Sequence, residues 1–155
     1  MALKTDRYEM QTDISYFMNE AQERGGVASL VTGGSGAAMD QSVNLVSYPP
    51  SASGRVPIGI LLNDVVNNDL TRVRVNPYKN EVQRGGKVTL LRKGYVVTNR
   101  IQGNPTAGQP AFPAHSGNIS PTNLVGGTMP VIGMFLSSRD QDGFAKVEVN
   151  LPTTN

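Results

Sequence analysis

Alternation of apolar and polar residues is the clearest pattern in this chain. Residues 71–76 and 146–149 alternate valine with polar residues. A period of two places successive side chains on opposite faces of a strand, so both segments are predicted as half-buried strands. Apolar runs bounded by Gly and Pro predict further strands. Together the predicted strands cover residues 27–32, 44–48, 58–62, 71–76, 86–91, 95–98, 131–136 and 144–151, with brief extended pieces at 111–112 and 118–119.

Residues 8–21 fit two patterns. Apolar side chains alternate from Tyr8 to Met18, which is typical of a strand, while Ile14, Phe17 and Ala21 also fit helical spacing. The alternating pattern runs longer and favours a strand. A short helix over residues 14–21 remains the alternative.

Turn residues separate the predicted strands. Lys93-Gly94 is predicted as a tight turn between two antiparallel strands. Residues 33–38, 49–54 and 103–128 are rich in Gly, Pro, Ser and Asn and are predicted as loops. Many short strands with this punctuation indicate an all-β fold, a small β-sandwich or β-barrel. We expect an extended N-terminal arm (residues 1–24) and a single β-domain (residues 25–155).

An internal repeat relates residues 59–76 to residues 133–150, with five identities in eighteen ungapped positions. Each copy is predicted as a pair of strands joined by a turn or by a longer excursion of the chain. In the closing strands, the valines should face the core and the charged residues should face outward. Gly59 and Gly133 open the two copies and are expected to permit a close backbone approach or a bulge. The predicted core valines are Val73, Val75, Val147 and Val149.

Composition narrows the possible functions. The 155 residues suit one modest domain, and the absence of cysteine excludes disulfides and thiol chemistry. The net charge is only +2, and no basic tract is longer than Arg92-Lys93, so direct binding of nucleic acid is not expected. No segment is apolar enough to predict a signal peptide or a membrane span, which favours synthesis in the cytoplasm.

No catalytic motif emerges from the sequence. His115 is the single histidine and lies in a predicted loop, without a Gly-x-Ser-x-Gly motif elsewhere to supply a nucleophile. Asp140 and Asp142 resemble part of a calcium loop, but Val149 stands where the closing glutamate is needed. We therefore predict that the protein is not an enzyme and that it uses no metal and no cofactor.

The N-terminal arm carries the main candidates for binding. Its apolar side chains are spaced along a polar segment, which suits a strand lying across a neighbouring subunit. Packing on its own domain is an equal alternative. The candidate interface residues are Leu3, Tyr8, Met10, Ile14, Tyr16 and Phe17.

Several stretches of the chain resemble capsid decoration (cement) proteins of tailed bacteriophages, including those of cyanophages. The order and spacing of these stretches carry the resemblance more than any one motif does. They are residues 6–8, 12–17, 57–75, 82–94, 132–136 and 140–149.

This resemblance implies a role in the virion. Such proteins are small β-domains that dock on the outer capsid surface, often as homotrimers at three-fold or quasi-three-fold positions. They bind the major capsid protein and stabilise the expanded shell against the pressure of packaged DNA. Two alternatives stay open. One is a virion fibre or a carbohydrate- or receptor-binding β-module, with its site in residues 103–128. The other is a small hydrolase that uses His115.

Overall fold

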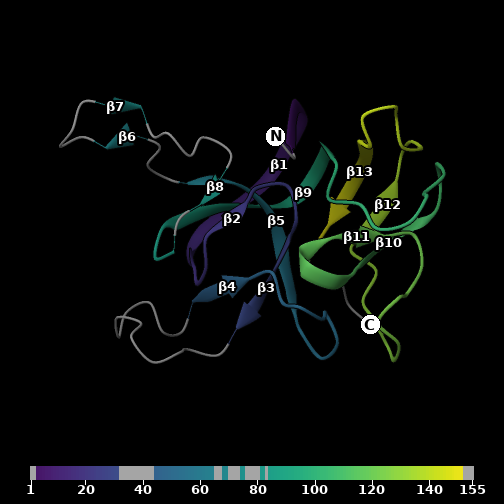
Figure 1. The fold of residues 1–155 in the computed structure, drawn as a ribbon, viewed down its shortest axis with the longest axis horizontal. Coiled ribbons are helices and arrows are strands. Elements are labelled where there is room, and N and C mark those ends of the chain that lie inside the picture. The colour runs from purple at the N-terminus through teal and green to yellow at the C-terminus, as the bar shows by residue number, and fades with distance from the viewer. Residues whose placement is uncertain are drawn as a thin grey trace.

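The computed structural model describes residues 3–31, 44–64, 68–69, 74–75, 81–82 and 84–151. These residues form strands and one short 3-10 turn (η1, His115–Gly117), which confirms the predicted all-β fold (Figure 1). The strands are β1 (Leu3–Met18), β2 (Gln22–Glu23), β3 (Val27–Val31), β4 (Leu45–Ser47), β5 (Pro57–Asp64), β6 (Asn68–Asp69), β7 (Arg74–Val75), β8 (Glu81–Val82), β9 (Lys87–Thr98), β10 (Pro110–Pro113), β11 (Ile119–Ser120), β12 (Gly133–Phe135) and β13 (Ala145–Asn150).

Five of these strands close on themselves as a small barrel. The order is β1-β4-β3-β5-β9, and β9 pairs again with β1. The closing contact between β1 and β4 is parallel and short, whereas β1 and β9 are antiparallel along most of their length. A closed ring removes the free sheet edges that invite aggregation.

The same sheet continues from β9 into a second, open half. There the order is β9-β13-β12-β10-β11, and all these pairings are antiparallel. Figure 1 shows this half beside the barrel, with β9 and β5 between the two. The sequence predicted a β-sandwich or a β-barrel, and the structure has a closed barrel that continues into an open half within one sheet.

Two hydrophobic clusters fill the two halves, and β5 and β9 form the wall between them. Leu61 and Leu90 face the cluster inside the barrel, while Ile60, Leu62 and Leu91 face the other cluster. All five side chains are fully buried. Burial on both faces explains why apolar residues follow one another without alternation at residues 60–62 of β5 and at residues 90–91 of β9.

Residues 3–18 form a strand, as the longer of the two sequence patterns predicted, and not a helix. The segment expected as an arm lies along β9 of its own chain (Figure 1). Its two ends, Leu3 and Met18, are buried in different clusters. Every side chain between them is exposed or half-buried.

The predicted turn at Lys93-Gly94 is wrong, because β9 runs without interruption from Lys87 to Thr98. Gly94 instead adopts a φ of +141° within the strand. A Cβ atom added there would lie 1.9 Å from the carbonyl oxygen of Tyr8 on β1. The glycine thus permits β1 to lie close against β9, and it does not reverse the chain.

The second copy of the internal repeat folds as predicted. β12 and β13 pair, Val147 and Val149 are buried, and Glu148 between them is exposed. An added Cβ on Gly133 would lie 1.8 Å from the carbonyl oxygen of Glu148, and one on Gly59 would lie 2.7 Å from that of Leu91. Both glycines therefore permit the close backbone approach expected of them.

The first copy lies only partly within the described residues, so its predicted pair of strands stays a prediction. β5 pairs with β3 and β9, whereas β7 pairs with β6. Val73 and the side chain of Val75 lie outside the described residues.

Tyr48 is a buried anchor between the two halves of the chain. Its hydroxyl accepts a hydrogen bond from the Gly26 amide at 3.0 Å and donates one to the Glu23 carbonyl at 2.8 Å. Its ring occupies space that side chains at Gly26 and Gly117 would fill. Burial raises the pKa of the Tyr48 hydroxyl well above its ordinary value of 10, so it remains a donor.

Replacing Tyr48 with phenylalanine should lower the free energy of unfolding by about 1–3 kcal/mol, because the buried Gly26 amide loses its acceptor. Urea denaturation followed by circular dichroism measures this loss. Tyr8→Phe is the matched control, since the exposed Tyr8 should tolerate the change. Equal stability of Tyr48→Phe and the unmodified protein would contradict the anchoring role.

Candidate interaction surface

The middle of β1 presents apolar side chains to solvent. Tyr8 is 53% exposed, Met10 is 67% exposed and Ile14 is 51% exposed. They lie on a strand that has β9 on one side and meets β4 only at its last two residues. Three large apolar side chains on one exposed strand are a feature of interaction surfaces.

The other three candidates from the sequence lie elsewhere. Leu3 is 2% exposed and belongs to the core, so it is not available to a partner in this conformation. Tyr16 is half-buried against the barrel cluster. Phe17 is also half-buried, and the Lys87 ammonium lies 6.0 Å from its ring centroid. Of the six predicted interface residues, only Tyr8, Met10 and Ile14 are therefore exposed together on β1.

A row of directly opposed residues extends from Tyr8 across the sheet. Tyr8 lies opposite Tyr95 on β9, Tyr95 lies opposite Glu148 on β13, and Glu148 lies opposite Met134 on β12. Met134 is itself 40% exposed. Directly opposed residues share one face of a sheet, so the row continues the exposed surface of β1 into the second half.

Ring contacts hold the first part of this row. The rings of Tyr8 and Tyr95 are stacked, with centroids 6.1 Å apart and planes 26° apart. The Lys146 ammonium lies 3.9 Å from the centroid of Tyr95. Aromatic and cation–π contacts of this kind limit the freedom of the side chains and present a firm surface.

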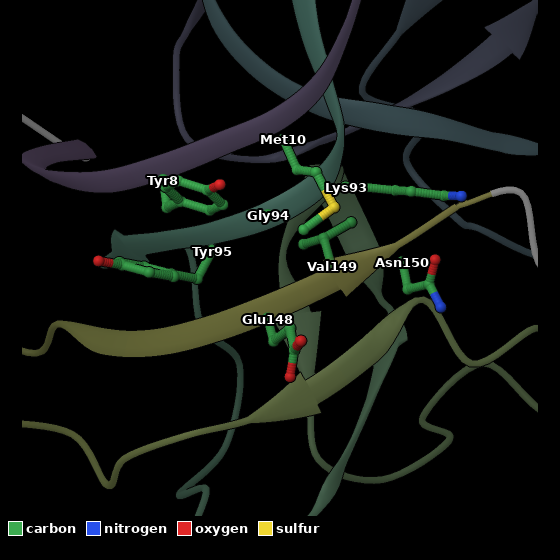
Figure 2. A pocket seen from close by; sticks show the side chains of 8 residues that line it. All are labelled: Tyr8, Met10, Lys93, Gly94, Tyr95, Glu148, Val149 and Asn150. Carbon is green, nitrogen blue, oxygen red and sulfur yellow. The ribbon is translucent and has the colours of Figure 1, made fainter.

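A groove of about 340 Å³ lies beside the stacked rings. Figure 2 shows Met10 projecting from β1 over Gly94, with Val149 below it and Lys93 and Asn150 at one end. The residues that line the groove are Tyr8, Met10, Lys93, Gly94, Tyr95, Glu148, Val149 and Asn150.

The groove carries one charge of each sign. Over the described ranges, neither the Lys93 ammonium nor the Glu148 carboxylate forms an ion pair. An apolar floor with a few polar groups at its margin is the usual composition of an interface centre and its rim. This surface suits a partner with matching apolar and charged groups.

Two ion pairs lie at the two ends of the exposed stretch of β1. Lys4 Nζ lies 3.3 Å from Asp140 Oδ2 and 4.5 Å from the centroid of the Phe144 ring. Arg92 lies 3.8 Å from Asp13. Both pairs are partly exposed, so each contributes little to stability.

Hydrogen bonds lower the pKa of the two carboxyl groups in these pairs. The Phe144 amide is the main cause that lowers the pKa of Asp140 below its ordinary value of 3.8, and the Lys4 and Asp142 contacts add to it. Partial burial raises the pKa of Asp13, but hydrogen bonds from Ser15 and the charge of Arg92 outweigh this effect and lower it overall. A carboxyl group is already ionised at neutral pH at its ordinary pKa, so the lowered pKa of each group extends the ionised range to more acidic pH.

The other residues considered for chemistry have structural partners. His115 is exposed, and its Nδ1 donates to the Pro50 carbonyl oxygen at 3.2 Å. Asp140 Oδ1 accepts the amides of Asp142 and Phe144, both at 2.9 Å, which closes the turn between β12 and β13. Among the described residues, no three His, Asp or Glu side chains are grouped so that they could hold a metal ion. The described part of the chain also contains no helix that is long and apolar enough to cross a membrane.

The sequence did not predict that β9, β12 and β13 also contribute to this surface, through Tyr95, Met134 and Glu148. The alternation in β13 did predict that Lys146 and Glu148 face outward. No sequence signal placed them beside Tyr8, because that neighbourhood depends on the register of three separate strand pairs.

Comparison with known proteins adds one finding. The family model described as structural cement protein (E217 gp24/Pam3 gp6) matches residues 7–150, which is nearly the whole chain. No curated protein matches the chain.

Proposed function

This chain belongs to the family of phage structural cement proteins, and we propose that it binds the outer surface of the phage capsid and stabilises the expanded shell against DNA pressure. The observation that carries this proposal is the family match over residues 7–150. The protein is made in the host cytoplasm and then docks on the major capsid protein. Its role is structural and involves no chemical step.

The exposed face of β1 and its neighbours is the proposed contact with the capsid. It combines Tyr8, Met10 and Met134 with charged groups at its margin. Tyrosine and methionine are enriched in the buried centres of protein interfaces. Burying these side chains against the capsid would remove apolar surface from water and so favour binding.

A homotrimer at three-fold or quasi-three-fold positions is the proposed assembly on the capsid. Closed cyclic symmetry is usual for homo-oligomers. Three copies bound together turn a weak contact into a durable one, because the second and third contacts form at a high effective concentration. Cementing follows if each copy touches more than one capsid subunit.

The stabilising role can be tested on DNA-filled capsids that lack this protein. Heating these particles should release DNA at a lower temperature than it does for particles with the protein restored. A fluorescent dye that reports exposed DNA measures the release. If the restored protein binds but leaves the release temperature unchanged, it decorates the shell without cementing it.

A further inference from the structure

We propose that residues 3–12 of β1 exchange between neighbouring copies on the capsid, so that β1 of one copy pairs with β9 of the next. The partner is a second copy of this chain, and the site it occupies is the place where β1 lies in Figure 1. The proposal rests on the proposed function only because the capsid brings copies together. Four features of β1 support it.

The first feature is the small contribution of this segment to the core. Leu3 is buried, but residues 4–12 contain no buried side chain. Strands that bury few apolar groups separate from their neighbours more readily than core strands do. Detaching residues 3–12 would remove one side chain, Leu3, from the core and none from the barrel cluster.

The second feature is the irregular pairing between β1 and β9. The register shifts between Leu3 and Arg7, and again on either side of Gln11. By contrast, β9 and β13 pair over six consecutive residues without a shift. Each irregularity interrupts the backbone ladder, so the β1 side of β9 is held less continuously than the β13 side.

The third feature is a natural hinge at residues 13–15. The register shifts again between Asp13 and Tyr16, and the Asp13 carboxylate accepts hydrogen bonds from the Ser15 amide and hydroxyl. Beyond the hinge the chain is fixed. The Met18 amide donates to the Gly86 carbonyl at 2.9 Å, and the Gly85 amide donates to the Met18 carbonyl at 2.8 Å.

The fourth feature is the close fit between β1 and the residues against which it packs. Gly94 leaves room for the Tyr8 carbonyl, Tyr95 stacks on Tyr8, and the core receives Leu3. Asp140 and Phe144 receive the Lys4 ammonium. All copies are identical, so β1 of a neighbour makes the same contacts, and exchange of an identical element is a low-cost route to association.

Distance and concentration also favour exchange on the capsid. Ten residues in a strand span roughly 33 Å, enough to reach an adjacent copy. Copies held side by side present β1 at a high effective concentration, which offsets the entropic cost of joining two chains. Exchanged strands would link the copies of a trimer into a closed ring.

Engineered disulfides distinguish exchange from the arrangement within one chain. The chain has no cysteine, so an introduced pair has no competing thiol. Tyr8 and Tyr95 are directly opposite, and such positions lie within the Cα separation that a disulfide requires. The test variant is Tyr8→Cys with Tyr95→Cys, oxidised on capsids and, separately, in concentrated solution.

The matched control is Tyr95→Cys with Glu148→Cys. These positions are also directly opposite, but β9 and β13 are both in the part of the chain that does not exchange. Tyr8→Cys alone is the control for random cross-linking and can form no species larger than a dimer. Circular dichroism of each variant establishes that it is folded before oxidation.

Exchange predicts covalent trimers or larger species of the test variant on non-reducing gels of oxidised capsids, and monomers of the matched control. If the folded, capsid-bound test variant is entirely monomeric with its disulfide formed, the exchange proposal is wrong while the proposed function stands. If the unmodified protein does not bind capsids, the proposed function fails instead. In that case covalent trimers in concentrated solution would still support exchange, and monomers there would overturn it.

Discussion

Replacing Gly133 with alanine should lower the free energy of unfolding by at least about 3 kcal/mol or prevent folding. The added Cβ would lie 1.8 Å from the carbonyl oxygen of Glu148 and 3.0 Å from the Cα of Val149. Both atoms belong to the backbone of β13, so no side-chain rotation relieves the clash. β12 and β13 would have to separate, which would open the cluster that contains Phe135 and Val147. Denaturant unfolding measures the effect.

Gly126→Ala is the matched control for this prediction. Gly126 has a φ of +80° and no atom within 4 Å of an added Cβ, so alanine there meets backbone strain but no clash. We expect a loss of about 1–2 kcal/mol. At Gly133 an added Cβ meets a clash, but the backbone has no positive φ. A loss of stability at Gly133 no larger than the loss at Gly126 would contradict the close packing of β12 on β13.

Replacing both Tyr8 and Met10 with glutamate should weaken capsid binding by at least about 100-fold while the domain stays folded. The two side chains project from β1 over the groove, and burying two carboxylates against the capsid is costly. Stability should fall only slightly, through loss of the stacked pair of Tyr8 and Tyr95. Sedimentation with capsids measures binding, and circular dichroism measures folding.

Two exposed apolar residues on other elements serve as controls for this variant. Val56 precedes β5, and Leu124 lies between β11 and β12. A variant with both Val56→Glu and Leu124→Glu adds the same two negative charges at other places and should bind capsids normally. If this control reduces binding as much as the variant with glutamate at Tyr8 and Met10 does, the contact with the capsid is not centred on β1.

Deleting residues 1–24, the segment that the sequence predicted as an arm, is not a clean test of this surface. The deletion would remove Met18 from the barrel cluster and Leu3 from the other cluster. It would also remove the strand that closes the barrel. A loss of binding would then report unfolding, so point substitutions on the exposed part of β1 are the better variants.

The sequence predicted most strands because their patterns are local. The valines of β13 alternate with charged residues, and the structure buries the valines and not the charges between them. The continuity of β9 could not be read in this way. Gly94 is a turn residue by local rules, but its role is set by β1, which approaches it from more than eighty positions earlier in the chain.

The candidate surface was only partly predictable for the same reason. Tyr8, Met10 and Ile14 stand out as apolar residues in a polar segment, and they are exposed. Leu3 shares that pattern but fills a core site, which only tertiary packing reveals. Met134 lies in an apolar run that suggests burial, although it is exposed beside Glu148.

The most direct test of the central claim is co-sedimentation of this protein with expanded, DNA-free capsids that lack it. We expect saturable binding at a fixed ratio to the major capsid protein, with a plateau that gives the number of copies per shell. The ratio should be the same for capsids from separate preparations. Protein that stays in the supernatant at all concentrations, although folded, would contradict its role as a capsid cement.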